Sequence, residues 1–413
     1  MMMYIFNIYT KGMSLEMKLI KRSEYLNKLI NVIGTPDIKV ITGVRRSGKS
    51  KLLEEFKKYI NQLEEASNVI HINYNLPKFE KIKTYDMLVT YVENNFKDNM
   101  NNYLLIDEIQ MCEDFEKAIN GFHAEEKFDI YITGSNAFLM SSDLATLFTG
   151  RTFKIEVYPF SFKEYLEYYK YKDIQEAFDS YVKEGGMSGS YLYKTQEEKY
   201  QYIKDVFNTL VIRDIKQKYK IRNTDIIQNL TDYLMDNISN LTSANNITKV
   251  LNKNNVSITD KTINNYIEYL CNAFAFYKMK RFDIKGRKYL STQNKYYLAD
   301  HAFKYAMLGT NNMDYGRVYE NIVAIELLRR GYEVYIGTLY QKEIDFVAKK
   351  QGKLIYIQVS DDISNEKTFK REVESLLKIK DAYPKIIIAR TKHETYQYEG
   401  IEILDIANWL SEK

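Results

Sequence analysis

Eight consecutive residues near the start of the chain have the types and the spacing of a phosphate-binding loop. They match the pattern G-x-x-x-x-G-K-S/T at every fixed position. The glycines let backbone N–H groups turn toward a phosphate, Lys49 can reach the β- and γ-phosphates, and the Ser50 hydroxyl can bind Mg²⁺. The pattern therefore predicts a site for ATP and Mg²⁺, made by Gly43, Val44, Arg45, Arg46, Ser47, Gly48, Lys49 and Ser50.

A strand-like run that ends in two acidic residues supplies a second part of this chemistry. In the sequence YLLIDE, residues 103–108, Asp107 is predicted to hold Mg²⁺ together with Ser50. Glu108 is predicted to polarise the attacking water. A buried strand ending in a charged turn is common by itself. Beside a phosphate-binding loop, it predicts ATP hydrolysis.

Three further residues are weaker candidates for the same site. The strand-like run 129–136 ends in small polar residues, and Ser135 or Asn136 is predicted to sense the γ-phosphate, although a plain turn at a strand end has the same composition. Arg151 could stabilise transition-state charge, in its own chain or across a subunit boundary of a homo-oligomer. A surface salt bridge is an equally good interpretation of Arg151.

The elements that must position these residues are indicated by hydrophobic periodicity. Residues 38–41 predict a strand before the loop, and apolar residues at helical spacing follow Ser50, which places the phosphates at a helix N-terminus. A length of 413 residues predicts two to four domains. Two cysteines cannot form a disulfide framework, which fits the cytoplasm, and no apolar run is long enough to span a membrane.

Several motifs in a fixed order make the chain resemble a known family. GVRRSGKS, LLIDEIQ, ITGSNAFL, TGR and YPFSFKEYLEY are followed by EGGMSGSYL, VIRDIKQKYKI and KYYLADHAFKYAMLG. In this order they resemble the AAA-type ATP-binding proteins of bacteria and archaea that carry a C-terminal domain of unknown function. The resemblance begins near Met17. It implies an αβα P-loop core in which one strand separates the acidic strand from the P-loop strand, with Lys49, Ser50, Asp107 and Glu108 in their usual roles and Arg151 as an arginine finger.

The middle of the chain has the outline of a winged helix. Helical patterns at 243–251 and 259–270, with Thr259 as the N-cap, precede strand-like runs at 274–282 and 288–290. A basic hairpin beside a helix-turn-helix suits duplex DNA. Docking of a protein, a lid on the ATPase and a plainly solvated hairpin remain as alternatives. The candidate DNA-binding residues are Lys278, Lys280, Arg281, Lys285, Arg287 and Lys288.

The C-terminal third resembles the restriction-endonuclease-like fold but departs from its metal site. That fold takes Glu from its first helix, Asp from its second strand and Glu-x-Lys from its third. Glu320 and Asp345 match, whereas Gln358 and Ser360 stand where Glu and Lys belong. Gln358 brings no negative charge to a cation, and Ser360 cannot stabilise attacking hydroxide. The sequence therefore predicts a degenerate site that binds or stabilises without cutting.

These inferences define one architecture and one leading function. The predicted fold class is α/β, with a P-loop core, a winged helix and a degenerate nuclease-like α/β domain. The predicted function is a cytoplasmic, Mg²⁺-dependent ATPase that couples ATP to the winged helix and contacts DNA, or a protein partner through the winged helix or the C-terminal domain. A nucleotide-gated regulator with little turnover and an ATP-driven nuclease are the alternatives. The expected segments are an N-terminal extension or misassigned start (1–16), the ATPase core (17–160), a helical connector (161–224), the winged helix (225–300) and the nuclease-like domain (301–413).

Overall fold

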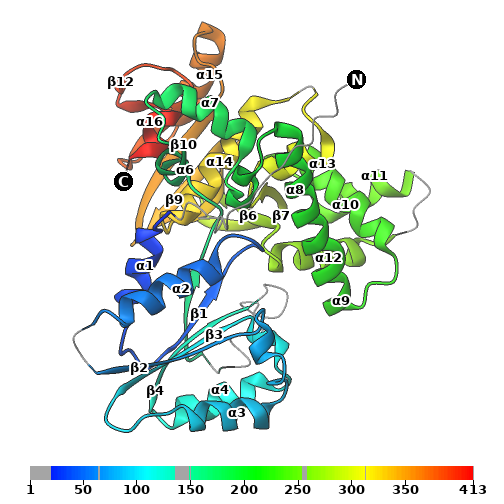
Figure 1. Ribbon diagram of the computed structural model, residues 1–413. Coiled ribbons are helices and arrows are strands. Elements are labelled where there is room, and N and C mark those ends of the chain that lie inside the picture. Colours follow the sequence, from blue (N-terminus) through cyan, green and yellow to red (C-terminus); the bar gives the residue numbers. More distant parts are fainter. Residues whose placement is uncertain are drawn as a thin grey trace, which may run out of the picture.

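The computed structural model describes residues 20–63, 66–134, 148, 150–253, 258–311 and 313–412. Figure 1 shows a sheet with helices on both faces at one end of the molecule, a group of helices at one side, and a second sheet at the other end. The expected extension at 1–16 lies outside the described residues.

A parallel five-stranded sheet forms the first of these layers. Its strand order is β2-β3-β4-β1-β5, and every neighbouring pair is parallel. Strand β4 lies between the P-loop strand β1 and the acidic strand β3, as predicted. The strands are β1 (Ile38–Thr42), β2 (Ser67–Asn73), β3 (Asn101–Asp107), β4 (Phe128–Thr133) and β5 (Thr152–Glu156).

Helices cover both faces of this sheet because its central strands are apolar on both sides. One face packs on α1 and α2 and the other on α3 and α4, with separate hydrophobic clusters. Leu53 and Phe56 of α2 are fully buried on one side, and Leu88 and Ile119 on the other. The predicted αβα core is therefore confirmed. The helices are α1 (Ser23–Ile30), α2 (Lys49–Ile60), α3 (Tyr85–Asn94) and α4 (Phe115–Ala124), with 3₁₀ turns η1 (Pro77–Phe79) and η2 (Ile109–Met111).

A helical segment leads from β5 to the rest of the chain. Two of its helices begin with complete capping boxes, at Ser161 and Thr195. Gly186 permits a tight turn between them, because a Cβ there would lie 2.2 Å from the Phe160 carbonyl oxygen. The elements are α6 (Phe162–Tyr169), α7 (Ile174–Glu184), the 3₁₀ turn η3 (Ser188–Leu192), α8 (Gln196–Asn208), the π-helix η4 (Thr209–Ile215) and α9 (Lys216–Tyr219).

The following helices and hairpin occur in the order expected from the sequence. Helix α12 begins at Asp260 after the Thr259 cap, whose hydroxyl accepts a hydrogen bond from Thr262 N–H. The second strand of the hairpin was expected at 288–290 but runs on to Leu298, because its last three residues are buried. The elements are α10 (Thr224–Asp236), α11 (Ala244–Lys253), α12 (Asp260–Asn272), β6 (Phe276–Asp283), β7 (Lys288–Leu298) and α13 (Ala302–Leu308).

The hairpin also belongs to the second sheet, which the sequence did not indicate. The eight strands run in the order β12-β13-β11-β10-β9-β8-β6-β7, and β6 pairs with β8 in parallel. The expected boundary at residue 300 thus falls within a continuous sheet. The remaining elements are α14 (Tyr315–Arg329), β8 (Glu333–Leu339), β9 (Lys342–Lys350), β10 (Lys353–Ser360), α15 (Glu366–Leu377), β11 (Lys385–Ala389), β12 (Tyr396–Tyr398), β13 (Ile401–Asp405) and α16 (Ile406–Ser411).

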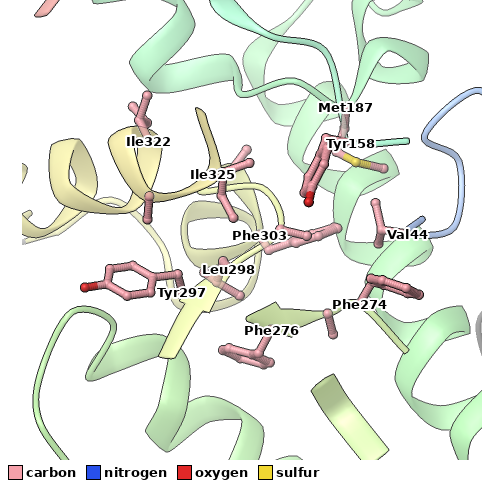
Figure 2. Packing of buried hydrophobic residues seen from close by; sticks show 14 of the residues in the cluster. Val44, Tyr158, Met187, Phe274, Phe276, Tyr297, Leu298, Phe303, Ile322 and Ile325 are labelled. Atoms are coloured by element: carbon pink, nitrogen blue, oxygen red, sulfur yellow. The ribbon is translucent and has the colours of Figure 1, made fainter. Parts of the chain in front are cut away.

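One hydrophobic cluster joins the P-loop to this sheet. Figure 2 shows side chains that belong to it, among them Val44 from the loop, Phe274 and Phe276 from the start of the hairpin, and Leu298 from its end. Val44 is fully buried. At the edge of the core, the Tyr277 hydroxyl of β6 donates to Glu156 of β5 at 2.8 Å. The nucleotide loop and the base of the hairpin therefore share one packed core.

Candidate nucleotide site

The P-loop backbone takes a conformation that only glycine accommodates at two positions. Gly43 has a φ of 134°, and a Cβ there would lie 2.0 Å from the carbonyl oxygen of Val157, which follows β5. Gly48 has a φ of 96° and directly precedes α2. The loop consequently turns tightly at the carboxyl end of β1 and directs the N-terminus of α2 at the space above it.

Lys49 is buried across the mouth of this loop. Its ammonium donates to the carbonyl oxygens of Gly43 at 2.8 Å and Val44 at 3.1 Å. Burial lowers the pKa of Lys49 to about 8, although Glu108 and Asp107 oppose this effect. A phosphate at the loop would restore the charge balance of this ammonium.

Asp107, at the end of β3, points into the same space. Its Oδ1 accepts a hydrogen bond from the Thr133 hydroxyl, and the carboxylate is 1% exposed. Burial raises the pKa of Asp107, while Thr133 and Ser50 lower it. Its Oδ2 is buried and has no hydrogen-bond partner among the described residues. Adjacent Ser50 and Asp107 oxygens suit Mg²⁺, a hard cation that prefers oxygen ligands.

Glu108 follows Asp107 in a left-handed backbone conformation, with a φ of 59°. Its N–H donates to Thr133 Oγ1 at 3.3 Å, and Gln110 Nε2 donates to its carboxylate. Such a conformation costs free energy and recurs at functional sites. It fixes the direction of the Glu108 side chain relative to Asp107.

Thr133 and Arg22 are site residues that sequence reasoning missed. Thr133 ends β4 and contacts both acidic positions. It opens the small polar end of the run 129–136, from which Ser135 and Asn136 were chosen instead. Arg22 precedes α1, is 5% exposed, and donates to the Ser47 carbonyl oxygen at 2.7 Å. It also forms an ion pair with Glu164 of α6 at 2.7 Å. Arg22 therefore ties the P-loop to the connector helices.

The other loop positions have separate environments. Arg46 has a left-handed φ of 66°. The hydroxyl of Ser47 is buried without a hydrogen-bond partner in the described part of the chain. The guanidinium of Arg45 forms an ion pair with Asp214 of η4 at 3.0 Å.

Of the three weaker candidates, Arg151 alone belongs to the described residues, and it lies away from this group. Ser135 and Asn136 lie outside the described residues. Arg151 precedes β5, and its carbonyl oxygen accepts from Ile38 N–H at the start of β1. Because β5 and β1 are parallel, five residues of β1, or about 16 Å, separate this point from the P-loop. The structure thus contradicts a role for Arg151 at the P-loop of its own chain.

The basic residues predicted to contact DNA lie along the hairpin. Arg281 is occupied by a hydrogen bond from its Nε to Thr338 Oγ1 at 3.1 Å. The remaining five are exposed, and three of them surround the hairpin turn. These five are Lys278, Lys280, Lys285, Arg287 and Lys288.

The four nuclease-like positions do come together, in a cleft of about 530 Å³. The Gln358 amide is bonded at both its oxygen and its nitrogen, accepting from Asp345 N–H and donating to Glu372, both at 2.7 Å. The Ser360 hydroxyl donates to the Asp362 carbonyl oxygen at 3.1 Å.

The sequence did not reveal that a lysine from β7 enters this cleft. Lys295 is 3% exposed and lies 2.8 Å from Glu320, 2.7 Å from Glu343 and 3.9 Å from Asp345. Burial alone would lower the pKa of Lys295, but the three carboxylates raise it. One ammonium therefore occupies the centre of the acidic group. Nothing in the local sequence around residue 295 signals this contact.

The described ranges contain no group of three or more His, Cys, Asp or Glu side chains arranged to hold a metal ion. No helix in the same ranges is both long and apolar enough to cross a membrane.

Comparisons with known proteins identify an AAA domain in the first part of the chain. Residues 35–166 match the family model described as AAA domain, and residues 175–314 and 315–409 match two domains of unknown function, DUF8612 and DUF4143. An uncharacterized protein of Haemophilus influenzae is 38% identical over 399 residues, which cover 95% of this chain and 98% of that protein. The uncharacterized protein MJ1544 of Methanocaldococcus jannaschii is 29% identical over 408 residues, or 94% and 89% of the two chains.

A solved structure has a partly similar arrangement. It is described as a Walker-type ATPase of Pyrococcus abyssi, with 15% identity and a TM-score of 0.49 over 70% of this chain and 95% of that chain.

Proposed function

Because this chain belongs to the same family as the Haemophilus influenzae protein and carries an AAA domain, we propose that it is an Mg²⁺-dependent ATPase. The observation that carries the proposal is the meeting of Lys49, Asp107, Glu108 and Thr133 at one edge of the sheet. Backbone N–H groups at the N-terminus of α2 and the Lys49 ammonium bind the phosphates.

Ser50 and Asp107 would hold Mg²⁺, directly or through water. The buried Asp107 Oδ2 without a partner among the described residues supports this assignment. When bound, Mg²⁺ neutralises charge on the phosphate oxygens. Thr133 keeps the Asp107 carboxylate oriented through its hydrogen bond.

Glu108 is the general base in this proposal. Its backbone is anchored to Thr133, and its carboxylate accepts from Gln110. From this position it would orient a water molecule and take its proton as the water attacks the γ-phosphate.

A cavity beside the P-loop supports a role in binding the nucleobase of ATP. It measures about 150 Å³ and adjoins Gly48 and Leu52 at the start of α2. Ile20, Phe160 and Leu192 contribute apolar walls. A flat, largely apolar nucleobase fits such a lining. ATP could therefore place its base in the cavity and its phosphates at the P-loop.

Purified protein tests this activity directly. Lys49→Ala should lose ATP binding and turnover together. Glu108→Gln should retain ATP but hydrolyse it about two to four orders of magnitude more slowly, the usual contribution of a general base. Glu93→Gln, an exposed carboxylate on α3 at the other face of the sheet, is the matched control and should behave as wild type. Equal turnover by wild type and Glu108→Gln would contradict the assignment.

The hairpin supports a second part of the proposal, contact with duplex DNA through a winged helix formed by α11, α12 and the β6–β7 hairpin. Lys285, Arg287 and Lys288 are exposed around its turn, and Tyr289 beside them is 54% exposed. Cations in this position neutralise backbone phosphates, which gives binding without much sequence preference. A protein partner for the same surface is the competing role.

Salt dependence distinguishes the two roles. Neutralising Lys285, Arg287 and Lys288 together should weaken binding to duplex DNA and reduce the log–log salt slope by about one unit per lost phosphate contact. Neutralising the exposed Lys117 and Lys127 of the ATPase core provides the control. Absence of binding to any duplex at low salt, with or without ATP, would favour protein docking.

We also propose that the C-terminal cleft does not cut nucleic acid. Lys295 supplies an ammonium that the sequence lacks at residue 360, but it is bound by three carboxylates rather than turned toward the cleft opening. The Gln358 amide is held on both sides. The cleft thus supports a stabilising or binding role.

A further inference from the structure

The Arg45–Asp214 ion pair connects the P-loop to the π-helix η4. Arg45 occupies one of the variable loop positions, and its Nη1 lies 3.0 Å from Asp214 Oδ2. Asp214 is 9% exposed, whereas the Arg45 side chain is 32% exposed. The Arg45 side chain is therefore partly exposed, while its partner is largely buried.

The Asp214 carboxylate lies within the electrostatic reach of the nucleotide site. It raises the pKa of Lys49, and the charge of Glu108 raises the pKa of Asp214. Burial is the largest cause of the raised pKa of Asp214, and Arg45 opposes it. Bound triphosphate would bring several negative charges to this space. It would attract Arg45 and repel Asp214.

The π-helix is suited to transmit such a change. π-helical turns are rare and are found mostly at functional sites. Leu210 and Ile215 of η4 are buried, and the segment continues directly into α9. The Tyr219 ring of α9 stacks on Tyr269 of α12 with centroids 3.5 Å apart. In Figure 1, α9 and α12 are neighbours in the helical group, and α12 leads into β6.

We propose that Asp214 is a nucleotide-responsive positioning residue. Its carboxylate binds the Arg45 guanidinium until a phosphate of ATP binds Arg45 instead. In the nucleotide-free protein the ion pair fixes η4 against the P-loop. When ATP binds, Arg45 exchanges the carboxylate for phosphate, and η4 and α9 are released to move relative to the core. This role of Asp214 rests on the proposed ATP binding. It adds the route by which the effect of ATP binding reaches α12 and the hairpin.

Neutralising Asp214 and neutralising Arg45 should have opposite effects on nucleotide affinity, and this difference tests the proposal. Asp214→Asn removes a carboxylate that competes for Arg45 and should tighten binding of the non-hydrolysable analogue AMPPCP about fivefold, the lower end of usual coupling between sites. Arg45→Gln removes the group that phosphate recruits and should weaken binding. Asp214→Glu keeps the charge and should resemble wild type. A merely structural ion pair would weaken binding in both neutral variants.

Hydrogen exchange supplies the second readout. In wild type, AMPPCP should speed exchange of the amides in 209–219. In Asp214→Asn, exchange should be fast already and unchanged by AMPPCP. Asp179→Asn breaks an ion pair of 2.7 Å between α7 and Arg390, the residue after β11, and should change neither readout.

The outcomes separate this proposal from the ATPase assignment. If wild type does not bind AMPPCP, the proposed function fails. If wild type binds it and 209–219 do not respond, or if both neutral variants weaken binding, the role of Asp214 is wrong. Should Asp214→Asn not fold, Arg45→Gln decides alone. Its exchange in 209–219 must then be fast and insensitive to AMPPCP.

Discussion

Replacing Lys49 with methionine should abolish nucleotide binding and, at the same time, stabilise the nucleotide-free protein. Burial lowers the pKa of Lys49 from 10.5 to about 8. At about 1.4 kcal/mol per unit, burying this ammonium costs about 3 kcal/mol at neutral pH. Methionine removes that cost but also removes the hydrogen bonds to Gly43 and Val44, worth about 1 kcal/mol each. We expect Lys49→Met to be more stable by about 1 to 2 kcal/mol.

The pH dependence gives a sharper form of the same prediction. Below about pH 8 both the folded and the unfolded chain hold the Lys49 proton, so the cost is constant. Between about pH 8 and 10.5 only the unfolded chain holds it, and the stability of wild type rises with pH. From about pH 7 to pH 9.5, wild type should gain about 2 kcal/mol relative to Lys49→Met.

Urea unfolding without nucleotide, at both pH values, measures this difference. Other groups titrate equally in both proteins and cancel in the comparison. Lys51→Met is the matched control, because Lys51 is 48% exposed on the same helix, and its difference from wild type should not depend on pH. If the free energies of unfolding of wild type and Lys49→Met change equally between about pH 7 and pH 9.5, the reasoning is refuted.

Three further predictions follow from contacts in the structure. Gly43→Ala would place a Cβ 2.0 Å from the Val157 carbonyl oxygen, so it should distort the loop and weaken ATP binding at least tenfold in a titration, whereas Gly121→Ala in α4, with open space around its Cβ and a helical backbone, should not. Arg22→Met leaves Glu164, whose side chain is only 14% exposed, without its cation and should lower stability by about 3 kcal/mol or more in urea unfolding. An unchanged unfolding midpoint would contradict the inference that Arg22 ties the P-loop to the connector helices. With Mg²⁺ or Mn²⁺, wild type should cleave DNA no faster than Asp345→Ala purified identically, and cleavage by wild type alone would show a live site.

The sequence indicated correctly those features that depend on contiguous residues. The P-loop occupies eight successive positions between a strand and a helix, and its geometry follows from local backbone requirements such as the left-handed glycines. Asp107 and Glu108 end an apolar strand, so their position at the sheet edge also followed from local pattern. The αβα layering of the core was indicated by the same motifs and is confirmed.

Only the tertiary structure decided which distant residues join these groups. Thr133, Arg22 and Asp214 reach the nucleotide site through strand order and helix packing, and none of the three is indicated by local periodicity. Lys295 meets Glu320 because the hairpin extends the C-terminal sheet. The spacing of residues along the chain does not predict this pairing.

Arg151 is the converse case, a residue that the sequence offered as a candidate for the site and that the fold places elsewhere. Its place in the sequence allowed a role at the P-loop of its own chain, a role across a subunit boundary, or a surface salt bridge. Parallel pairing of β5 with β1 puts Arg151 at the far end of the strands, which contradicts the first of these. Local patterns specify backbone conformation and which face is apolar. Which charges finally meet depends on how strands are ordered and paired, and that is set by packing of the whole chain.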